Sequence, residues 1–109
     1  MIINSLVFFK EIKQDINYQN RCYGITEMNY SFDNGDYFGV YEKTIKNKLT
    51  DKKPDIDVSQ YEAFGRYYYN YLMAKTYKNN SKYLKEMEKE KSLITWTKIL
   101  DVIDTLQVK

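Results

Sequence analysis

The sequence predicts an α+β fold in which a single domain spans residues 1–109. Apolar residues recur every three or four positions near the start of the chain and again beyond residue 58, which is typical of helices. Around residue 34 they alternate with polar residues instead, which is typical of strands. A chain of 109 residues supports one modest hydrophobic core, so we expect one domain. The expected order is an N-terminal helix, an antiparallel β-hairpin and three further helices.

The first predicted element is a helix over about residues 2–17. Its apolar residues lie three or four positions apart and so share one side of a helix: Ile2, Leu6, Phe9, Ile12 and Ile16. A buried strand over residues 3–9 is the alternative, because an apolar run this short fits either structure.

The hairpin is predicted over residues 28–41. Asn34-Gly35 separates two alternating runs, and both residues tolerate the positive φ angles of a type I′ turn. The facing pairs across this hairpin would be Phe32 with Tyr37, Tyr30 with Gly39, and Met28 with Tyr41. One side of the hairpin would therefore be aromatic.

Three helices are expected after a lysine-rich connection over residues 43–57. Ser59-Gln60-Tyr61-Glu62 matches a capping box, which predicts a helix over about 59–78. Asn80-Ser81 offers a new cap for a helix over 81–91, and a further apolar stripe predicts a third over 93–106. The predicted core comprises Leu6, Phe9, Ile12, Phe32, Phe64, Tyr68, Leu72, Trp96, Leu100 and Ile103.

The composition argues against an enzyme. The chain has no histidine, so the side chain best suited to proton transfer near neutral pH is missing. Cys22 is the only cysteine, and no base or motif surrounds it. The closest acidic cluster is Asp51, Asp55 and Asp57, of which the last two could share a divalent cation, but such residues more often belong to a solvated loop that leads into a helix cap. We therefore expect no catalytic residue, no metal site and no cofactor.

The composition also indicates a setting. A single cysteine fits a reducing compartment, so the cytoplasm is expected. No run approaches the roughly 18 apolar residues that cross a membrane. Lys, Asn, Ile and Tyr are favoured over Arg, Ala, Gly and Pro, which indicates an AT-rich genome such as that of a low-GC bacterium, its phages or its mobile elements.

The stretch FGRYYYNY, residues 64–71, carries the clearest hint of a binding site. On a helix from Ser59, one side would be filled by Tyr61, Phe64, Tyr68 and Leu72, while Tyr69 and Met73 lie opposite, beside an ion pair between Glu62 and Arg66. Gly65 predicts the close approach of another backbone. Tyr, Met and Arg are enriched at protein interfaces. The predicted partner-binding residues are Arg66, Tyr67, Tyr69, Met73, Asn34 and Tyr37.

Two functions fit this reading. The first is a non-enzymatic module that inhibits or modulates a larger protein or protein complex by stoichiometric binding. The alternative is a nucleic-acid-binding protein, resembling a winged helix in arrangement, in which tyrosines stack on bases and lysines contact phosphates. Its candidate lysines are Lys46, Lys48, Lys52 and Lys53, with Lys75, Lys78, Lys82 and Lys85. The net charge of +2 and the presence of only two arginines favour protein binding.

Overall fold

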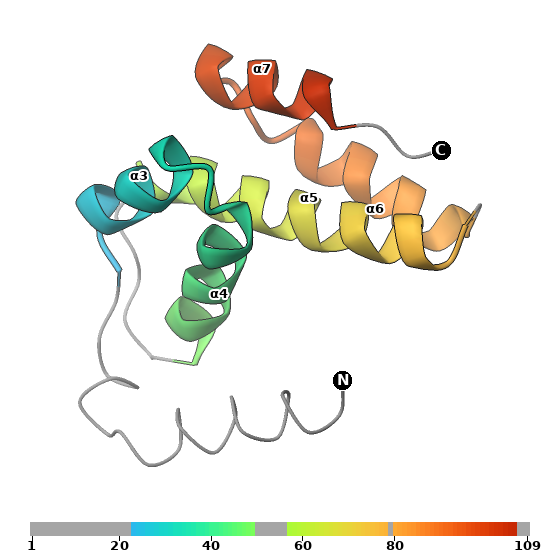
Figure 1. Cartoon of the computed structure of the whole chain (residues 1–109), viewed down its shortest axis with the longest axis horizontal. Helices are drawn as coiled ribbons and strands as arrows, with labels where there is room; N and C mark the ends of the chain where they lie inside the picture. Colours follow the sequence, from blue (N-terminus) through green and yellow to red (C-terminus); the bar gives the residue numbers. More distant parts are fainter. Residues whose placement is uncertain (1–22, 50–56, 79, 107–109) are drawn as a thin grey trace.

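The computed structural model describes residues 23–49, 57–78 and 80–106, and these residues form five helices and no strand (Figure 1). The predicted α+β class is therefore wrong, and the described part of the chain is all-helical. The N-terminal helix predicted over 2–17 lies outside the described residues, together with the predicted core residues Leu6, Phe9 and Ile12. The helices are α3 (Ile25–Asp33), α4 (Tyr37–Lys48), α5 (Val58–Thr76), α6 (Ser81–Lys91) and α7 (Thr97–Thr105).

The residues predicted as a hairpin form α3, a tight turn and α4. Gly35 has a φ of +74°, as a hairpin turn would require, but here it ends a helix. Its amide donates to the Phe32 carbonyl (3.0 Å) and the Asp36 amide donates to the Ser31 carbonyl (2.9 Å), which is the hydrogen-bond pattern of a Schellman motif. Asp36 then caps α4 by accepting from the Gly39 amide (3.0 Å). The Asn-Gly pair suits both kinds of turn, because each needs a residue with positive φ.

The central element is α5, which contacts α3, α4 and α6. In Figure 1 it crosses the molecule, with α6 running back beside it, α4 pointing away from it and α7 on the opposite side from α4. This central position explains why α5 is apolar around most of its circumference. Its buried residues are Val58, Tyr61, Ala63, Phe64, Gly65, Tyr67, Tyr71 and Ala74.

Gly65 lets α4 cross α5 at close range. A β-carbon at residue 65 would lie 2.6 Å from the Thr44 hydroxyl oxygen and 3.1 Å from the Tyr41 α-carbon. The predicted approach of a second backbone is thus confirmed, although that backbone belongs to a helix and not to a strand. The absence of a side chain at this crossing sets how near the two helices lie.

The core is built mainly from aromatic rings. Phe32 meets Phe64 edge to face at 5.1 Å between ring centroids, and Trp96 meets Tyr61 edge to face at 5.4 Å. Phe32, Phe64 and Ile103 are buried, as predicted. The other described members of the predicted core are partly buried and pack against it, namely Tyr68, Leu72, Trp96 and Leu100.

The helix ends follow the predictions in part. α6 begins and ends where predicted, and the Asn80 side chain caps it by accepting from the Lys82 amide (3.0 Å). α5 begins one residue earlier than predicted, so Ser59 lies inside its first turn and Asp57 takes the cap position. α4 extends to Lys48, which places residues 43–48 of the predicted 43–57 connection in a helix.

The last helix, α7, was predicted to begin at residue 93. It begins only at Thr97 because the Gln60 side chain forms hydrogen bonds with the turn that precedes it. The Gln60 side-chain oxygen accepts from the amides of Thr95 (2.9 Å) and Trp96 (3.2 Å). Its amide nitrogen donates to the Leu93 carbonyl (3.1 Å). One side chain from the first turn of α5 therefore fixes the α6–α7 connection.

Candidate functional site

The tyrosines of residues 67–71 point toward different neighbours. Tyr67 and Tyr71 are buried, at 6% and 8% exposure. Tyr68 packs against the Tyr37 ring at 5.8 Å between centroids. Tyr69 is 36% exposed and faces α4 instead. The run is therefore mostly core, and Tyr69 is the member that reaches the surface.

The described surface has an apolar region along the side of α4 that is not buried, next to the crossing of α4 with α5. The inward side of α4 is formed by Val40, Thr44 and Asn47. On the outward side, apolar residues recur at spacings of three and four, and the row continues onto α5. We call this region the outer face, and it comprises Phe38, Tyr41, Ile45 and Leu49 of α4 with Tyr69 and Met73 of α5.

Ring contacts join the two helices of the outer face. Tyr41 stacks on Tyr69, with 4.9 Å between centroids and 17° between the ring planes. Phe38 lies 5.6 Å from Tyr41 and is 49% exposed, while Leu49 is 47% exposed at the other end of α4. Burial raises the pKa of Tyr41, helped by Tyr69 and by the Glu42 carboxylate. Like any tyrosine at physiological pH, Tyr41 is neutral and can act as a hydrogen-bond donor.

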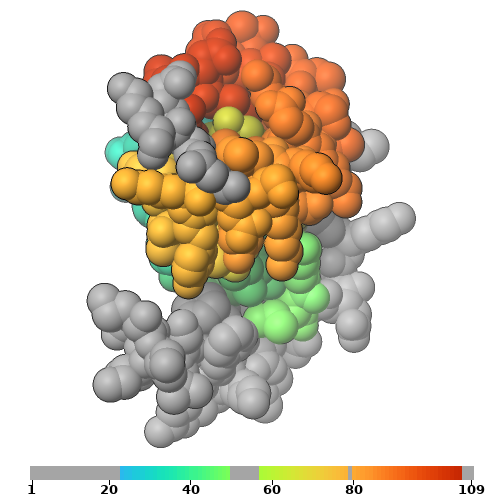
Figure 2. Space-filling view, turned by 90° about the vertical axis from the view of Figure 1, so that its right-hand side faces the viewer, coloured from blue at the N-terminus to red at the C-terminus, as the bar shows by residue number. Residues whose placement is uncertain are grey.

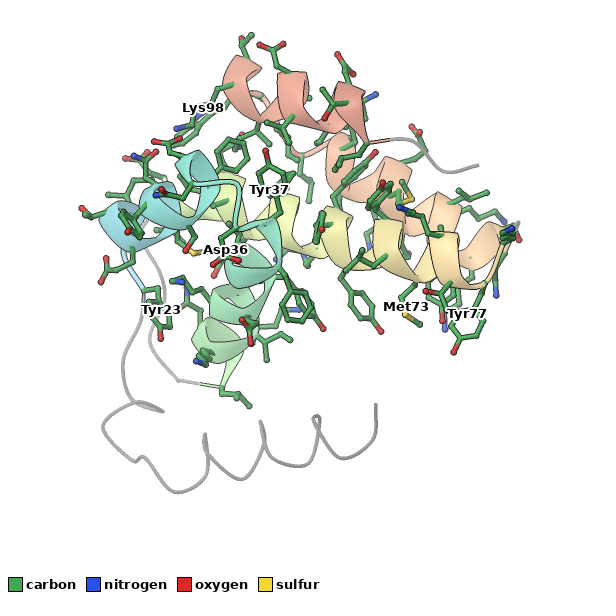
Figure 3. The ribbon with its side chains drawn as sticks, viewed as in Figure 1. Tyr23, Asp36, Tyr37, Met73, Tyr77 and Lys98 are labelled. Atoms are coloured by element: carbon green, nitrogen blue, oxygen red, sulfur yellow. The ribbon has the colours of Figure 1, made fainter. Side chains whose placement is uncertain are left out.

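Met73 continues the outer face along α5. It lies one helical turn beyond Tyr69 and is partly buried. In Figure 3 Met73 and Tyr77 project from the same edge of the C-terminal half of α5, the edge on the side of α4. The outer face therefore spans two helices that meet at the Gly65 crossing.

Glu62 and Arg66 do not form the exposed ion pair that the sequence predicts beside Tyr69 and Met73. Arg66 pairs with Glu90 of α6 (Nε to Oε1, 2.9 Å), and Glu90 is only 6% exposed. Glu62 accepts instead from the side-chain amide of Asn47 (3.0 Å). The predicted ion pair between Glu62 and Arg66 is thus wrong, because each residue finds a partner on a neighbouring helix.

Tyr67 lies between α5, α6 and α7. Burial raises the pKa of its phenol, and the carboxylates of Glu88 and Asp104 raise it further, followed by Tyr71. Because the Tyr67 side chain faces the interior, little of its surface is available for the predicted role in recognition.

The remaining predicted residues are spread over the molecule. Asn34 is exposed in the α3–α4 turn, where its side-chain amide donates to the Tyr30 carbonyl (2.7 Å). Tyr37 is partly buried among the core rings and points inward in Figure 3. Lys46 and Lys48 lie in the last turn of α4. Lys52 and Lys53 lie outside the described residues. The structure brings Tyr69 and Met73 together and leaves the others apart.

Phe38, Ile45 and Leu49 are the surface residues that the sequence prediction missed. The sequence prediction divides residues 37–49 between a strand and a connection, so it takes no account of the helical spacing of these three residues. An apolar row spaced by three and four residues, namely Phe38, Tyr41, Ile45 and Leu49, would have indicated a helix.

A separate polar cluster surrounds Lys98 of α7 (Figure 3). Its ammonium donates to Asn29 (2.6 Å) and Asp33 (3.2 Å) of α3, and Asn29 also accepts from the buried Tyr61 hydroxyl. Burial lowers the pKa of Lys98, but the Tyr61 and Asp33 interactions outweigh it and leave the pKa above its ordinary value. This cluster ties α7 to α3 and α5, and its groups already satisfy one another, which indicates a structural role.

The chain matches no protein-family model, no curated protein and no solved structure. Within residues 23–49, 57–78 and 80–106, no three His, Cys, Asp or Glu side chains gather as a metal site would require. No helix in this same part of the chain is both long and apolar enough to cross a membrane.

Proposed function

We propose that the chain acts without catalysis, by stoichiometric binding of a larger protein through the outer face. The observation that carries the proposal is that the apolar row of α4 lies on its outward side. Val40 on the inward side is fully buried, whereas Phe38 and Leu49 on the outward side are about half exposed. A surface helix normally buries its apolar side, so an apolar row left on the outward side indicates contact with another surface.

The composition of the outer face fits such contact. Aromatic rings and methionine provide large contact area at a modest loss of side-chain entropy. The stacked rings of Tyr41 and Tyr69 hold each other in place before binding, which lowers that loss further. Lys46 and Lys48 lie beside Leu49 at the end of α4. We therefore expect a partner surface with an apolar centre and acidic residues toward this end.

The proposed role is that of an inhibitor or modulator of a larger complex in the cytoplasm, encoded by a phage or a mobile element. Support for this setting comes from the sequence alone. The single cysteine suits a reducing compartment, and the bias toward Lys, Asn, Ile and Tyr suits a low-GC host. The host expectation decides which cell lysate should supply the partner.

The test is affinity capture from a lysate of a low-GC bacterium, with and without nuclease treatment, in which the wild-type chain and three variants are compared. Phe38→Ala and Tyr69→Ala change the outer face. Leu93→Ala is the matched control, because Leu93 is similarly exposed (53%) but lies in the α6–α7 connection. We expect one protein or complex that wild type and Leu93→Ala retain and that both face variants lose. With the purified partner, Tyr69→Ala should weaken binding by about 1 to 3 kcal/mol.

Melting temperatures and nuclease dependence separate the other outcomes. If the face variants retain the same proteins as wild type, the proposal is wrong. A large fall in their melting temperatures would show that the outer face is covered within the chain itself. Capture that disappears after nuclease treatment would move the case to nucleic acid.

A further inference from the structure

The charge of the chain is balanced overall but not along its length. Between Glu62 and Glu86 the sequence has five basic residues and no acidic one. Four of these five gather where α5 ends and α6 begins, at the end of the molecule that faces the viewer in Figure 2. All four are exposed. They are Lys75, Lys78, Lys82 and Lys85.

Aromatic rings lie among these lysines. Tyr77 follows the last turn of α5, is 55% exposed and stacks on Tyr83 of α6, with 6.2 Å between centroids and 24° between the ring planes. The Lys82 ammonium lies 5.5 Å from the Tyr83 ring centroid, and the Lys75 ammonium lies 5.2 Å from that of Tyr71. We call Lys75, Lys78, Lys82 and Lys85 with Tyr77 and Tyr83 the basic tip.

Helix stability accounts for Lys75 but not for Lys82. Lys75 lies in the last turn of α5, where a cation interacts favourably with the helix dipole. Lys82 lies in the first turn of α6, where the dipole favours acidic side chains and where there is none. Its charge opposes the stability of its own helix at this position. The placement of Lys82 among the other three lysines therefore points to an external anion.

We propose that the basic tip binds single-stranded nucleic acid. Its lysines would contact successive phosphates, and the exposed ring of Tyr77 would stack on a base. Lysine supplies charge without reading bases, and a tyrosine stacks on any base, so the expected binding is tolerant of sequence. A duplex offers phosphates but no unstacked base for Tyr77. The basic tip shares no residue with the outer face, so the inference does not rest on the proposed function.

The test is the fluorescence anisotropy of a labelled oligothymidylate of about 16 nucleotides, titrated with the full chain. A duplex of equal length and vesicles of phosphatidylcholine with phosphatidylserine serve as alternative probes. Lys82→Glu should weaken oligothymidylate binding about tenfold. Tyr77→Leu keeps an apolar side chain but removes the ring, and it should weaken binding about fivefold or more. Lys89→Glu is the control, since it makes the same charge change on α6 beyond the basic tip.

The proposal requires oligothymidylate binding that falls steeply between about 50 and 200 mM salt, exceeds duplex binding and is retained by Lys89→Glu. It is overturned if the oligonucleotide does not bind. It is equally overturned if Lys89→Glu loses as much affinity as Lys82→Glu, if Tyr77→Leu binds like wild type, or if the duplex binds as well. Vesicle binding without oligothymidylate binding would assign the basic tip to an anionic membrane surface instead. Melting temperatures of all variants show whether each is folded.

Discussion

The Thr44 hydroxyl of α4 occupies the space that a side chain at Gly65 of α5 would need. A β-carbon there would lie 2.6 Å from that oxygen and 3.1 Å from the Tyr41 α-carbon, which belongs to the backbone and cannot turn away. Gly65→Ala is therefore expected to lower the free energy of unfolding by about 1 to 3 kcal/mol, measured by urea denaturation. This loss exceeds the gain of about 1 kcal/mol that alanine brings to a helix.

The double variant Thr44→Ala/Gly65→Ala separates the two contacts. Removing the hydroxyl relieves the closer contact but leaves the Tyr41 α-carbon in place. Gly65→Ala should therefore lower the free energy of unfolding less in the Thr44→Ala background than in wild type, but should still lower it. A Gly65→Ala protein more stable than wild type would show that α4 and α5 have room to spare at their crossing.

Gly35 presents the opposite case, because a side chain at this position would be strained without being crowded. Its φ is +74°, and nothing lies within 4 Å of a β-carbon built there. Gly35→Ala should lower the free energy of unfolding by about 1 to 2 kcal/mol through backbone strain alone. Gly35→Asn is the matched comparison and should cost less, since asparagine tolerates this conformation better. Equal losses for the two variants would contradict the conformational explanation.

Arg66 is expected to contribute to stability. Its partner Glu90 is 6% exposed, so Arg66→Ala would leave a nearly buried carboxylate without its charged partner. The expected loss is about 1 to 3 kcal/mol in the free energy of unfolding. In a double-mutant cycle, Glu90→Ala should then cost less in the Arg66→Ala background than in wild type. Additive losses would show that the ion pair contributes nothing.

Stability should fall at alkaline pH, and Tyr67 should account for part of the fall. Burial, then Glu88 and Asp104, raise the pKa of its phenol above the ordinary 10.0, so the folded state keeps this proton to higher pH than the unfolded state. The stabilisation is complete below about pH 10 and is lost as the pH rises through the folded-state pKa. Tyr67→Phe should flatten the decline in unfolding free energy above about pH 10. Tyr30→Phe, at a position that is 71% exposed, is the control.

The helices beyond residue 58 could be predicted because their sequence signals are unambiguous. Asn80 before a polar helix and an apolar stripe through Ile103 have one common interpretation. The hairpin prediction failed because Met28 and Phe32 fit two periods at once. They are two alternations apart in a strand and one turn apart in a helix. The choice between strand and helix then depended on Asn34-Gly35, a pair that suits the end of a helix as well as a hairpin turn.

The candidate site was predictable only where it did not depend on neighbouring helices. Tyr69 was expected to be exposed and is, because its place on α5 follows from the helical period. Arg66 was expected beside Glu62, yet Glu90 lies closer in space although it is 24 residues away. Local spacing identifies possible partners within a helix, but tertiary packing decides which of them is used.

The hydrogen bonds between Gln60 and the α6–α7 connection affect the order in which parts of the chain unfold. The amides of Thr95 and Trp96 can exchange with solvent only after Gln60 releases them. Their exchange rates should therefore follow the opening of the first turn of α5, about 35 positions earlier, and not the fraying of α6 just before them. In refolding, α7 then docks as a late and non-local event, after the first turn of α5 has formed.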